Sequence, residues 1–250
     1  MSGLAGAIPR AGGAGNGADA GGDARAADAG AAEPPSAFAH GPGFSVPYLA
    51  GVTLGERVFP KHERTTPDGA PDLRKAAIYR GPVLPSPRGA GQLVETVVKV
   101  AARRHEPSFP IEVALQMRAS ALPGVRGRGW LAPAVLAVAY TDSFAYLVME
   151  AVKGETLADK LEDGPAWALS ETQGPKRNRS LAAEVRAAVG ALARAGIAFL
   201  DRTPYNFMWG AVGGAGEPHI VVIDYGNTRE ATPERAAEEA EGGLLNKDFK

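Results

Sequence analysis

The chain has 250 residues, of which 45% are hydrophobic, so it can form one large domain with a core or two small ones. Its formal net charge of −1 indicates neither nucleic-acid binding nor a membrane surface, and we expect neither partner. It contains no cysteine, which excludes disulfides, a thiolate zinc site and a cysteine nucleophile.

Residues 1–45 are predicted to be a disordered tail. The first 40 residues include 14 Ala and 9 Gly without hydrophobic periodicity, so ordering them would cost more entropy than their burial returns. Residues 46–250 then suit one two-lobed domain better than two independent ones. No apolar run reaches the roughly 18 residues of a membrane span, and no compact apolar signal core is present. We therefore expect a cytoplasmic protein.

Strands dominate the first part of the predicted domain. Two short β-like runs, 46–59 and 75–80, are separated by a polar turn, and a Pro/Gly-rich connection at 81–91 follows. Residues 93–100 are rich in β-branched residues and predict a strand. A helix comes next, capped by Ser108 with Pro110 in its first turn; its apolar face is predicted to carry Ile111, Leu115 and Leu122.

Two hairpins and two helices are predicted in the second part. The first hairpin comprises 134–140 and 144–149, and a short helix at 156–161 follows the polar segment after it. A loop at 163–179 leads to a long helix that Ser180 caps. Its apolar residues at helical spacing are Leu181, Val185, Val189, Leu192 and Ile197. The second hairpin comprises 207–212 and 219–223 around a glycine-rich turn.

Lys99 is the one charged residue in the run 97–100, where a strand interior ordinarily holds apolar side chains. A buried lysine needs a partner, and Glu112 on the predicted helix can supply a carboxylate. The alternative is that Lys99 points outward from an edge strand.

Asp201 and Asn206 lie on a loop between the long helix and a strand. A carboxylate can orient an attacking hydroxyl, and an amide oxygen can bind magnesium, which prefers oxygen ligands. Both residue types are also common in turns. Asp224 ends the β-branched run 220–223, and Gly226 then lets the backbone turn sharply. This carboxylate is either a second magnesium ligand or a strand-capping residue before a turn.

Lys99, Glu112, Asp201, Asn206 and Asp224 together offer what phosphoryl transfer requires. That reaction depends on a fixed cation, oxygen ligands for a metal and a carboxylate beside the acceptor hydroxyl. The order of these residues among the predicted elements resembles that of the protein-kinase superfamily over roughly residues 50–230. The resemblance implies an α+β, bilobal protein-kinase-like fold with a β-rich N-lobe at 46–150 and a truncated, mainly helical C-lobe at 151–250.

The resemblance also implies roles for single residues. The run 97–100 is similar to the family's Val-Ala-Ile-Lys strand, with Glu112 as the helix partner of Lys99. Segment 147–154 is similar to the connection between the lobes. Met149 would then border the adenine of ATP, and the backbone of Glu150 and Val152 would bind it. Asp201 would be the catalytic aspartate, and Asn206 and Asp224 the ligands of Mg²⁺.

The sequence departs from the family pattern at four places. The glycine-rich phosphate loop is not recognisable, because the stretch before residue 77 holds only Gly69. Phe199 replaces the histidine expected two residues before Asp201, and Thr203 replaces a lysine. Only 24 residues follow Gly226, which leaves no room for the usual substrate-binding helices. This shortened form is similar to RIO-type and other minimal kinases, and it leaves room for a partner chain that completes the C-lobe.

Three functions remain open from these residues. The first is an atypical Ser/Thr protein kinase that uses ATP and Mg²⁺ and acts on a protein hydroxyl. The second is a pseudokinase that binds nucleotide or a partner without turnover. The third is a small-molecule kinase of the aminoglycoside type. The Ala/Gly-rich tail is similar to proteins from GC-rich genomes, including large DNA viruses, which would locate the chain in host cytoplasm or the virion.

Overall fold

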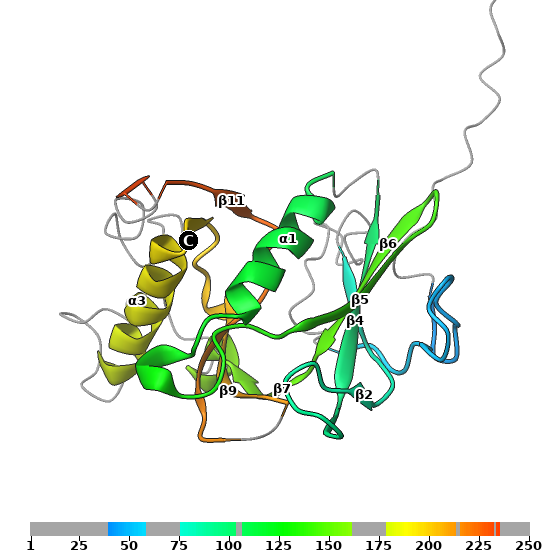
Figure 1. Cartoon of the computed structure of the whole chain (residues 1–250), viewed down its shortest axis with the longest axis horizontal. Helices are drawn as coiled ribbons and strands as arrows, with labels where there is room; N and C mark the ends of the chain where they lie inside the picture. Colours follow the sequence, from blue (N-terminus) through cyan, green and yellow to red (C-terminus); the bar gives the residue numbers. More distant parts are fainter. Residues whose placement is uncertain are drawn as a thin grey trace, which may run out of the picture. The chain divides into compact units, whose positions relative to one another are not determined.

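The computed structural model describes residues 40–58, 76–103, 107–161, 179–213, 216–232 and 234–235 (Figure 1). All of them belong to one unit, Pro35–Lys250, and form a mixed α+β structure. The helices are α1 Phe109–Ser120, α2 Leu157–Lys160 and α3 Arg179–Arg194, with 3₁₀ turns η3 Val125–Gly127 and η6 Pro204–Asn206. The strands are β1 Ala77–Arg80, β2 Leu84–Pro85, β3 Leu93–Val94, β4 Thr96–Ala102, β5 Val135–Tyr140, β6 Phe144–Glu150, β7 Val152–Thr156, β8 Ile197–Phe199, β9 Phe207–Val212, β10 His219–Val222 and β11 Thr228–Glu230.

The main sheet has the strand order β1-β4-β6-β5, and every neighbouring pair is antiparallel. Side chains alternate between the faces of β4, so Val98 and Val100 face one apolar cluster while Ala101 packs against α1 on the other face. Lys99 lies opposite Ile78 on β1 and Leu147 on β6. The edge-strand alternative for Lys99 is therefore wrong, because β4 is an inner strand.

Helix α1 contributes to two apolar clusters of the described structure, and Figure 1 shows it between β6 and α3. Its position matches the prediction, and Leu115 is buried as predicted with Leu122 packed nearby, but the rest of its buried face differs. Ile111 is exposed and Leu122 lies beyond the helix end, whereas Glu112 and Gln116 are buried. Ser108 makes no side-chain cap. Apolar periodicity was misleading here because two polar residues occupy the buried side of the helix.

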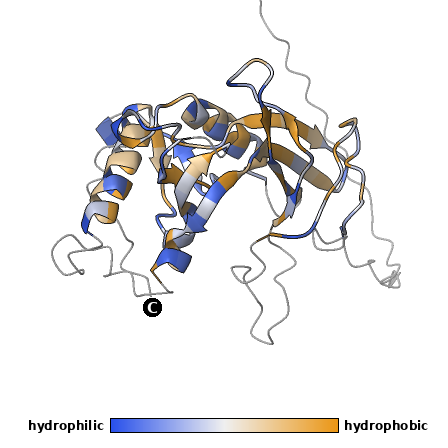
Figure 2. Cartoon of the chain, turned by 90° about the horizontal axis from the view of Figure 1, so that it is seen from below, coloured by the Kyte–Doolittle hydropathy of each residue, from blue (hydrophilic) through white to orange (hydrophobic). Residues whose placement is uncertain are grey.

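A second core lies around α3. Leu181, Val185, Val189 and Leu192 are buried there as predicted, against β8, β9, β10 and the C-terminal part of α1. The helix begins at Arg179, so Ser180 is inside it and is not its cap, and Ile197 belongs to β8. Figure 2 shows hydrophobic residues concentrated in the strands, whereas the helices carry both kinds.

A three-stranded sheet with the order β10-β9-β7 joins the segment after β6 to the second hairpin. Its strand β7 was not predicted, because 152–156 is mostly polar and is held by pairing with β9. Gly154 and Gly210 lie opposite each other, and a Cβ on Gly154 would approach the Trp209 carbonyl oxygen to 2.2 Å. Glycine therefore permits the close approach of these two strands.

Other predicted strands are shorter than expected. In the run 46–59 the described residues form bridges, Ser45 with Thr53 and Arg57 with Tyr79, in place of a strand. The run 93–100 is interrupted at Glu95, and its first two residues pair with β2 in the predicted connection. The sequence between 59 and 75, where a phosphate loop was sought, is outside the described residues, as are 1–39 of the tail and 162–178.

Residues 40–45 of the predicted tail lie against the main sheet. His40 Nε2 is 3.1 Å from the Tyr146 hydroxyl, and its ring packs edge-on against Phe44 and Phe144. Among the helices that the structure describes, none is both long and apolar enough to span a membrane.

Candidate functional site

Lys99, Glu112 and Asp224 meet around one ammonium group, and we call them the Lys99 cluster. Lys99 Nζ donates to Glu112 Oε1 at 2.6 Å and to Asp224 Oδ1 at 3.1 Å. The three residues come from β4, α1 and the segment after β10, so Lys99 and Asp224 are 125 positions apart. Lys99 and Glu112 are buried, but the Asp224 side chain is 53% exposed. The cluster is thus closed on the helix side and open beside Asp224.

The backbone around Asp224 aims its carboxylate at Lys99. Asp224 has φ of 58°, in the left-handed region, which costs a non-glycine residue about 1–3 kcal/mol. The Gly226 amide donates to Asp224 Oδ1 at 3.2 Å. A Cβ on Gly226 would lie 3.2 Å from that same oxygen and 3.6 Å from Lys99 Nζ. Gly226 is therefore a close neighbour of the cluster, and a larger residue there would crowd both charges.

The loop with Asp201 and Asn206 is joined to the residue before Asp224. The Ile223 amide donates to the Asn206 carbonyl at 2.9 Å, and Asn206 Nδ2 donates to the Asp201 carbonyl at 2.9 Å. Asn206 is buried, and because its amide nitrogen is used as a donor, its Oδ1 remains an acceptor. The Asp201 carboxylate makes no hydrogen bond to another described residue.

Aromatic rings support this loop from behind. Phe199 is buried, and its ring centroid is 5.7 Å from that of Tyr225 and 5.6 Å from that of Phe207. Phe199 thus fills the place of the expected histidine by packing. Tyr225 is fully buried, its hydroxyl has no hydrogen-bond partner among the described residues, and burial raises its pKa.

Arg202 is the cation of the loop that carries Asp201. It is buried, and its Nε donates to the Phe199 carbonyl at 3.0 Å.

The segment 149–152 runs from β6 into β7. Met149 Sδ accepts from Gln116 Nε2 at 3.3 Å, and Gln116 lies one turn after Glu112 on α1. The Ala151 carbonyl accepts from Gly213, so the antiparallel pattern makes Val152 and Val212 a non-hydrogen-bonded pair. The backbone groups of Val152 therefore point away from β9. The Glu150 amide is already used, because it donates to the Ala134 carbonyl at 3.0 Å.

Glu150 belongs to a second ionic group, the Arg88 cluster, which consists of Arg88, Glu150 and Trp130. Arg88 Nε is 3.0 Å from Glu150 Oε2, Arg88 Nη2 donates to the Ala132 carbonyl at 2.8 Å, and the guanidinium lies 4.5 Å from the Trp130 ring centroid. Glu150 Oε2 also accepts from the Ala134 amide at 3.0 Å. Desolvation lowers the pKa of Arg88, and the Glu150 carboxylate opposes that effect.

Arg118 ties α1 to the strand that follows the Asp224 turn. Its Nη1 pairs with Glu230 on β11, and its Nη2 donates to the Ala195 carbonyl just after α3 at 2.6 Å. The ion pair is exposed, which limits its contribution to stability to under about 1 kcal/mol. Its effect is to fix the end of the helix that carries Glu112.

The sequence-predicted residues are thus arranged in three groups. Glu112 and Asp224 each contact Lys99, Asp201 and Asn206 are linked to Asp224 through Ile223, and Met149 is linked to α1 through Gln116. The roles of Gln116 and Arg118 were missed. The only sequence signal for Gln116 is that it follows Glu112 by four residues, one helical turn, and Arg118 has no such signal.

Two carboxylates contact one ammonium in the Lys99 cluster, and the Asp224 carboxylate lies on its open side. Among the described residues, no group of three or more His, Cys, Asp and Glu side chains could hold a metal. Any metal here would depend on a carboxylate, an amide oxygen and ligands that it brings with it. A scan against protein-family models finds no match for the chain, and a search of curated proteins finds none either.

Proposed function

We propose that this chain is a shortened protein-kinase-like phosphotransferase that uses ATP and Mg²⁺ to phosphorylate the hydroxyl group of Ser or Thr in a protein. The observation that carries the proposal is the Lys99 cluster: one ammonium held between a helix carboxylate and a strand-end carboxylate. In this proposal the main sheet with α1 forms an N-lobe, and α3 with the strands after it forms a reduced C-lobe.

The residues present fit both ligands. Magnesium prefers hard oxygen ligands, and the Asp224 carboxylate and Asn206 Oδ1 provide such atoms on adjoining segments. Asp224 is half exposed, so its carboxylate is open to solvent on one side. The absence of a side chain at Gly226 leaves room beside both Asp224 and Lys99. ATP would supply the transferable phosphate, and Mg²⁺ would neutralise part of its charge between the phosphates and these carboxylates.

Each residue then has a defined task. Lys99 holds phosphate oxygens, and Glu112 fixes its direction through the 2.6 Å contact. Asp201, whose carboxylate has no competing bond to a described residue, orients the acceptor hydroxyl and takes up its proton. Asn206 and Asp224 hold the metal. Met149 borders the base, and the backbone of Glu150 and Val152 binds it. In Glu150 the backbone carbonyl oxygen is the group that binds the base, because the backbone amide already donates to the Ala134 carbonyl.

One observation favours a second candidate, a nucleotide-binding module without turnover. Phosphoryl transfer is helped by positive charge near the acceptor. In the loop 201–206 the nearest cation, Arg202, donates to the Phe199 carbonyl and is buried, and Thr203 stands where the related enzymes carry lysine. Such a site would bind nucleotide and transfer phosphate slowly or not at all.

The deciding experiment measures binding and turnover on the same full-length protein. Thermal unfolding is followed with ATP alone, with Mg²⁺ alone and with both, and phosphate transfer is followed with γ-labelled ATP by autophosphorylation and on a mixed protein substrate. We expect a rise in melting temperature that requires both ligands, together with transfer. Binding without transfer would favour the module, and absence of both would overturn the proposal.

The matched variants are Asp224→Asn and Asp142→Asn. Asp142 lies in the exposed turn between β5 and β6, so its replacement changes the same charge away from the site. Asp224→Asn should abolish magnesium-dependent stabilisation and transfer, and Asp142→Asn should change neither. Equal activity in the Asp224 variant would refute its assignment. A panel of sugars and aminoglycosides, assayed by ADP release, tests the small-molecule alternative.

A further inference from the structure

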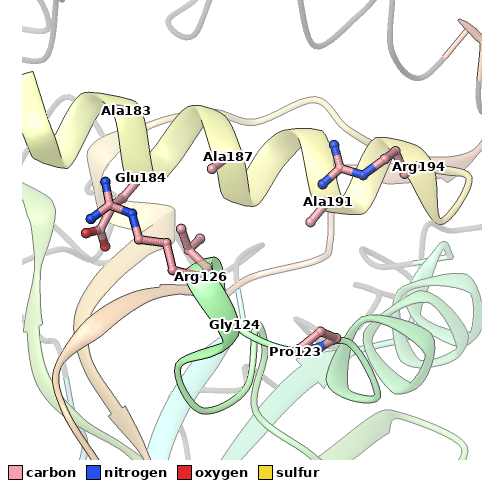
Figure 3. Close-up of a pocket in the computed structure, with 9 residues that line it drawn as sticks. Pro123, Gly124, Arg126, Ala183, Glu184, Ala187, Ala191 and Arg194 are labelled. Carbon is pink, nitrogen blue, oxygen red and sulfur yellow. The ribbon is translucent and has the colours of Figure 1, made fainter.

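A groove separate from the Lys99 cluster lies between α3 and the turn at 123–126 (Figure 3). Its volume is about 260 Å³. Glu184 and Arg126 lie at one end of the groove, and Arg194 lies at the other. Between these ends α3 presents a row of small side chains, namely Ala183, Ala187 and Ala191. The groove is therefore apolar in the middle and charged at both ends.

Glu184 is the observation that points to a ligand. The residue is only 6% exposed, and its Oε2 is buried without a hydrogen-bond partner among the described residues. Figure 3 shows its carboxylate near Arg126, but the described structure contains no ion pair between the two. Burying a carboxylate oxygen without a donor costs free energy, and native proteins rarely leave such an atom unsatisfied. A donor from a bound partner would satisfy it.

The two arginines determine the other charges that a ligand needs. Arg126 and Arg194 are exposed, and neither makes an ion pair with another described residue. Arg194 lies back along α3, since a Cβ on Gly190 would be 3.5 Å from its Nη1. With Glu184, the groove therefore holds two positive charges and one negative charge. A complementary ligand carries a basic group for Glu184 and acidic groups for the arginines.

The length of the groove suits an extended stretch of polypeptide. Glu184 and Arg194 are ten residues apart on α3, or about 15 Å at the rise of a helix. In an extended chain, side chains four residues apart face the same side and lie about 13 Å from each other. An apolar side chain midway between them would face the alanines. A small ion would reach only one end of the groove.

The turn on the other side of the groove is fixed by its own contacts. The Gly124 amide donates to the Gly129 carbonyl at 3.0 Å, and the Gly127 amide donates to the Gly124 carbonyl at 3.0 Å. Val125 is buried against the core around α3. Arg126 has φ of 60°, a left-handed conformation that residues other than glycine rarely adopt. A wall that is formed before a ligand arrives lowers the cost of ordering on binding.

We propose that this groove binds an extended segment of a partner protein, in which a basic residue and an acidic residue stand four positions apart with an apolar residue midway. The basic side chain donates to Glu184, the apolar one covers the alanines, and the acidic one pairs with Arg194. A second acidic residue beside the basic one pairs with Arg126. No residue of the Lys99 cluster lines the groove, so this interaction does not depend on the proposed function.

The first test selects binders from a display library of random seven-residue peptides on the full-length protein and, in parallel, on its Glu184→Gln variant. The matched control is Glu56→Gln, which removes the same charge at an exposed position outside the groove. We expect peptides with the proposed spacing, in either chain direction, to be enriched on the unmodified and control proteins but not on Glu184→Gln. Absence of any enrichment that depends on Glu184 would overturn the proposal.

The second test measures the affinity of one selected peptide by fluorescence anisotropy. Because the contact is a charge-assisted hydrogen bond, Glu184→Gln should weaken binding about tenfold. Replacing the basic residue of the peptide by Gln should then cause no further loss on that variant, whereas additive losses would overturn the contact. Arg194→Gln should weaken binding roughly threefold, and Arg186→Gln, exposed on the same helix outside the groove, should leave it unchanged.

Two further measurements separate a ligand site from a structural carboxylate. Without peptide, Glu184→Gln should raise the melting temperature, because it removes a buried charge that lacks a donor. A fall would show that the carboxylate has a donor within the protein, and it would overturn the proposal. Sedimentation of the unmodified protein should show no dimer that Glu184→Gln dissociates. Such a dimer would assign the groove to a second copy of the chain and would equally overturn the proposal.

Discussion

The two buried ionic groups of this protein differ in what surrounds them. In the Arg88 cluster, Glu150 is 1% exposed, and its carboxylate is paired with a guanidinium and capped by a backbone amide. In the Lys99 cluster, Lys99 and Glu112 are equally buried, but the third member, Asp224, is 53% exposed. The first group is closed to solvent, although Arg88 Nη1 is buried without a hydrogen-bond partner among the described residues, whereas the second has a carboxylate on an open side. Openness to solvent, more than burial of the ion pair, therefore separates the candidate site from the structural ion pair.

The largest expected effect comes from replacing the buried pair of the Lys99 cluster by apolar residues. Lys99→Met with Glu112→Leu should lower phosphate transfer at least a thousandfold, equivalent to about 4 kcal/mol of activation free energy. The free energy of unfolding should stay within about 1 kcal/mol of that of the unmodified protein, because apolar residues of similar volume can replace a buried ion pair at little cost. Labelled-phosphate transfer and urea unfolding measure the two quantities. Transfer that survives in this variant would contradict the role of the cluster.

The same kind of replacement in the Arg88 cluster should give the opposite pattern. Arg88→Met with Glu150→Leu should cost about 2–3 kcal/mol of unfolding free energy, because the Ala134 amide loses its buried acceptor. Transfer at a temperature well below unfolding should stay within about threefold. The surface change Glu155→Gln is the control, with an expected cost under about 0.5 kcal/mol. A large loss of activity with unchanged stability would remove the distinction between the clusters.

A smaller effect is expected from Gly226→Ala. The added methyl group would press on the Asp224 carboxylate, so we expect a roughly tenfold loss of transfer, about 1.4 kcal/mol, with little change in melting temperature. Gly41→Ala is the control, since a Cβ there meets nothing within 4 Å. If both variants transfer phosphate as fast as the unmodified protein, the site does not require a glycine at position 226.

The smallest effect, and a favourable one, is expected from Tyr225→Phe. Removing a buried hydroxyl without a partner should raise the unfolding free energy by about 1 kcal/mol. Burial raises the pKa of Tyr225, so the folded form keeps its proton when the unfolded form loses it. The stabilisation of the folded state that comes from this pKa difference is complete below about pH 10, and it is lost as the pH rises above that value. The free energy of unfolding, measured by urea titration, should therefore fall less between pH 9 and 11 in Tyr225→Phe than in the unmodified protein. An equal fall in both proteins would show that the Tyr225 hydroxyl has a hydrogen-bond partner.

Much of the secondary structure followed from local pattern, and the exceptions have physical causes. The hairpin of β5 and β6, helix α3 and the hairpin of β9 and β10 have strong periodicity and lie close to their predicted ranges. Strand β7 could not be predicted, because its residues are polar and its partner β9 is over 50 positions away. The buried face of α1 was misjudged because Glu112 and Gln116 occupy it, and their burial depends on Lys99 and Met149.

The sequence allowed the residues of the candidate site to be predicted, but not the distances between them. Lys99 and Asp224 stood out because a charge interrupts or ends a β-branched run. The 3.1 Å distance between them depends on how α1, the main sheet and the Asp224 turn pack, which no local pattern encodes. The Arg88 cluster was missed altogether, because Arg88 lies in a Pro/Gly-rich connection and its partner is 62 positions away.

Arg118 gives the protein a mechanical connection that runs through one side chain. The guanidinium contacts the strand leaving the Asp224 turn and the chain end of α3, while its own helix carries Glu112. A shift of β11 would therefore reach the last turn of α1, less than two turns from Glu112, through this exposed contact.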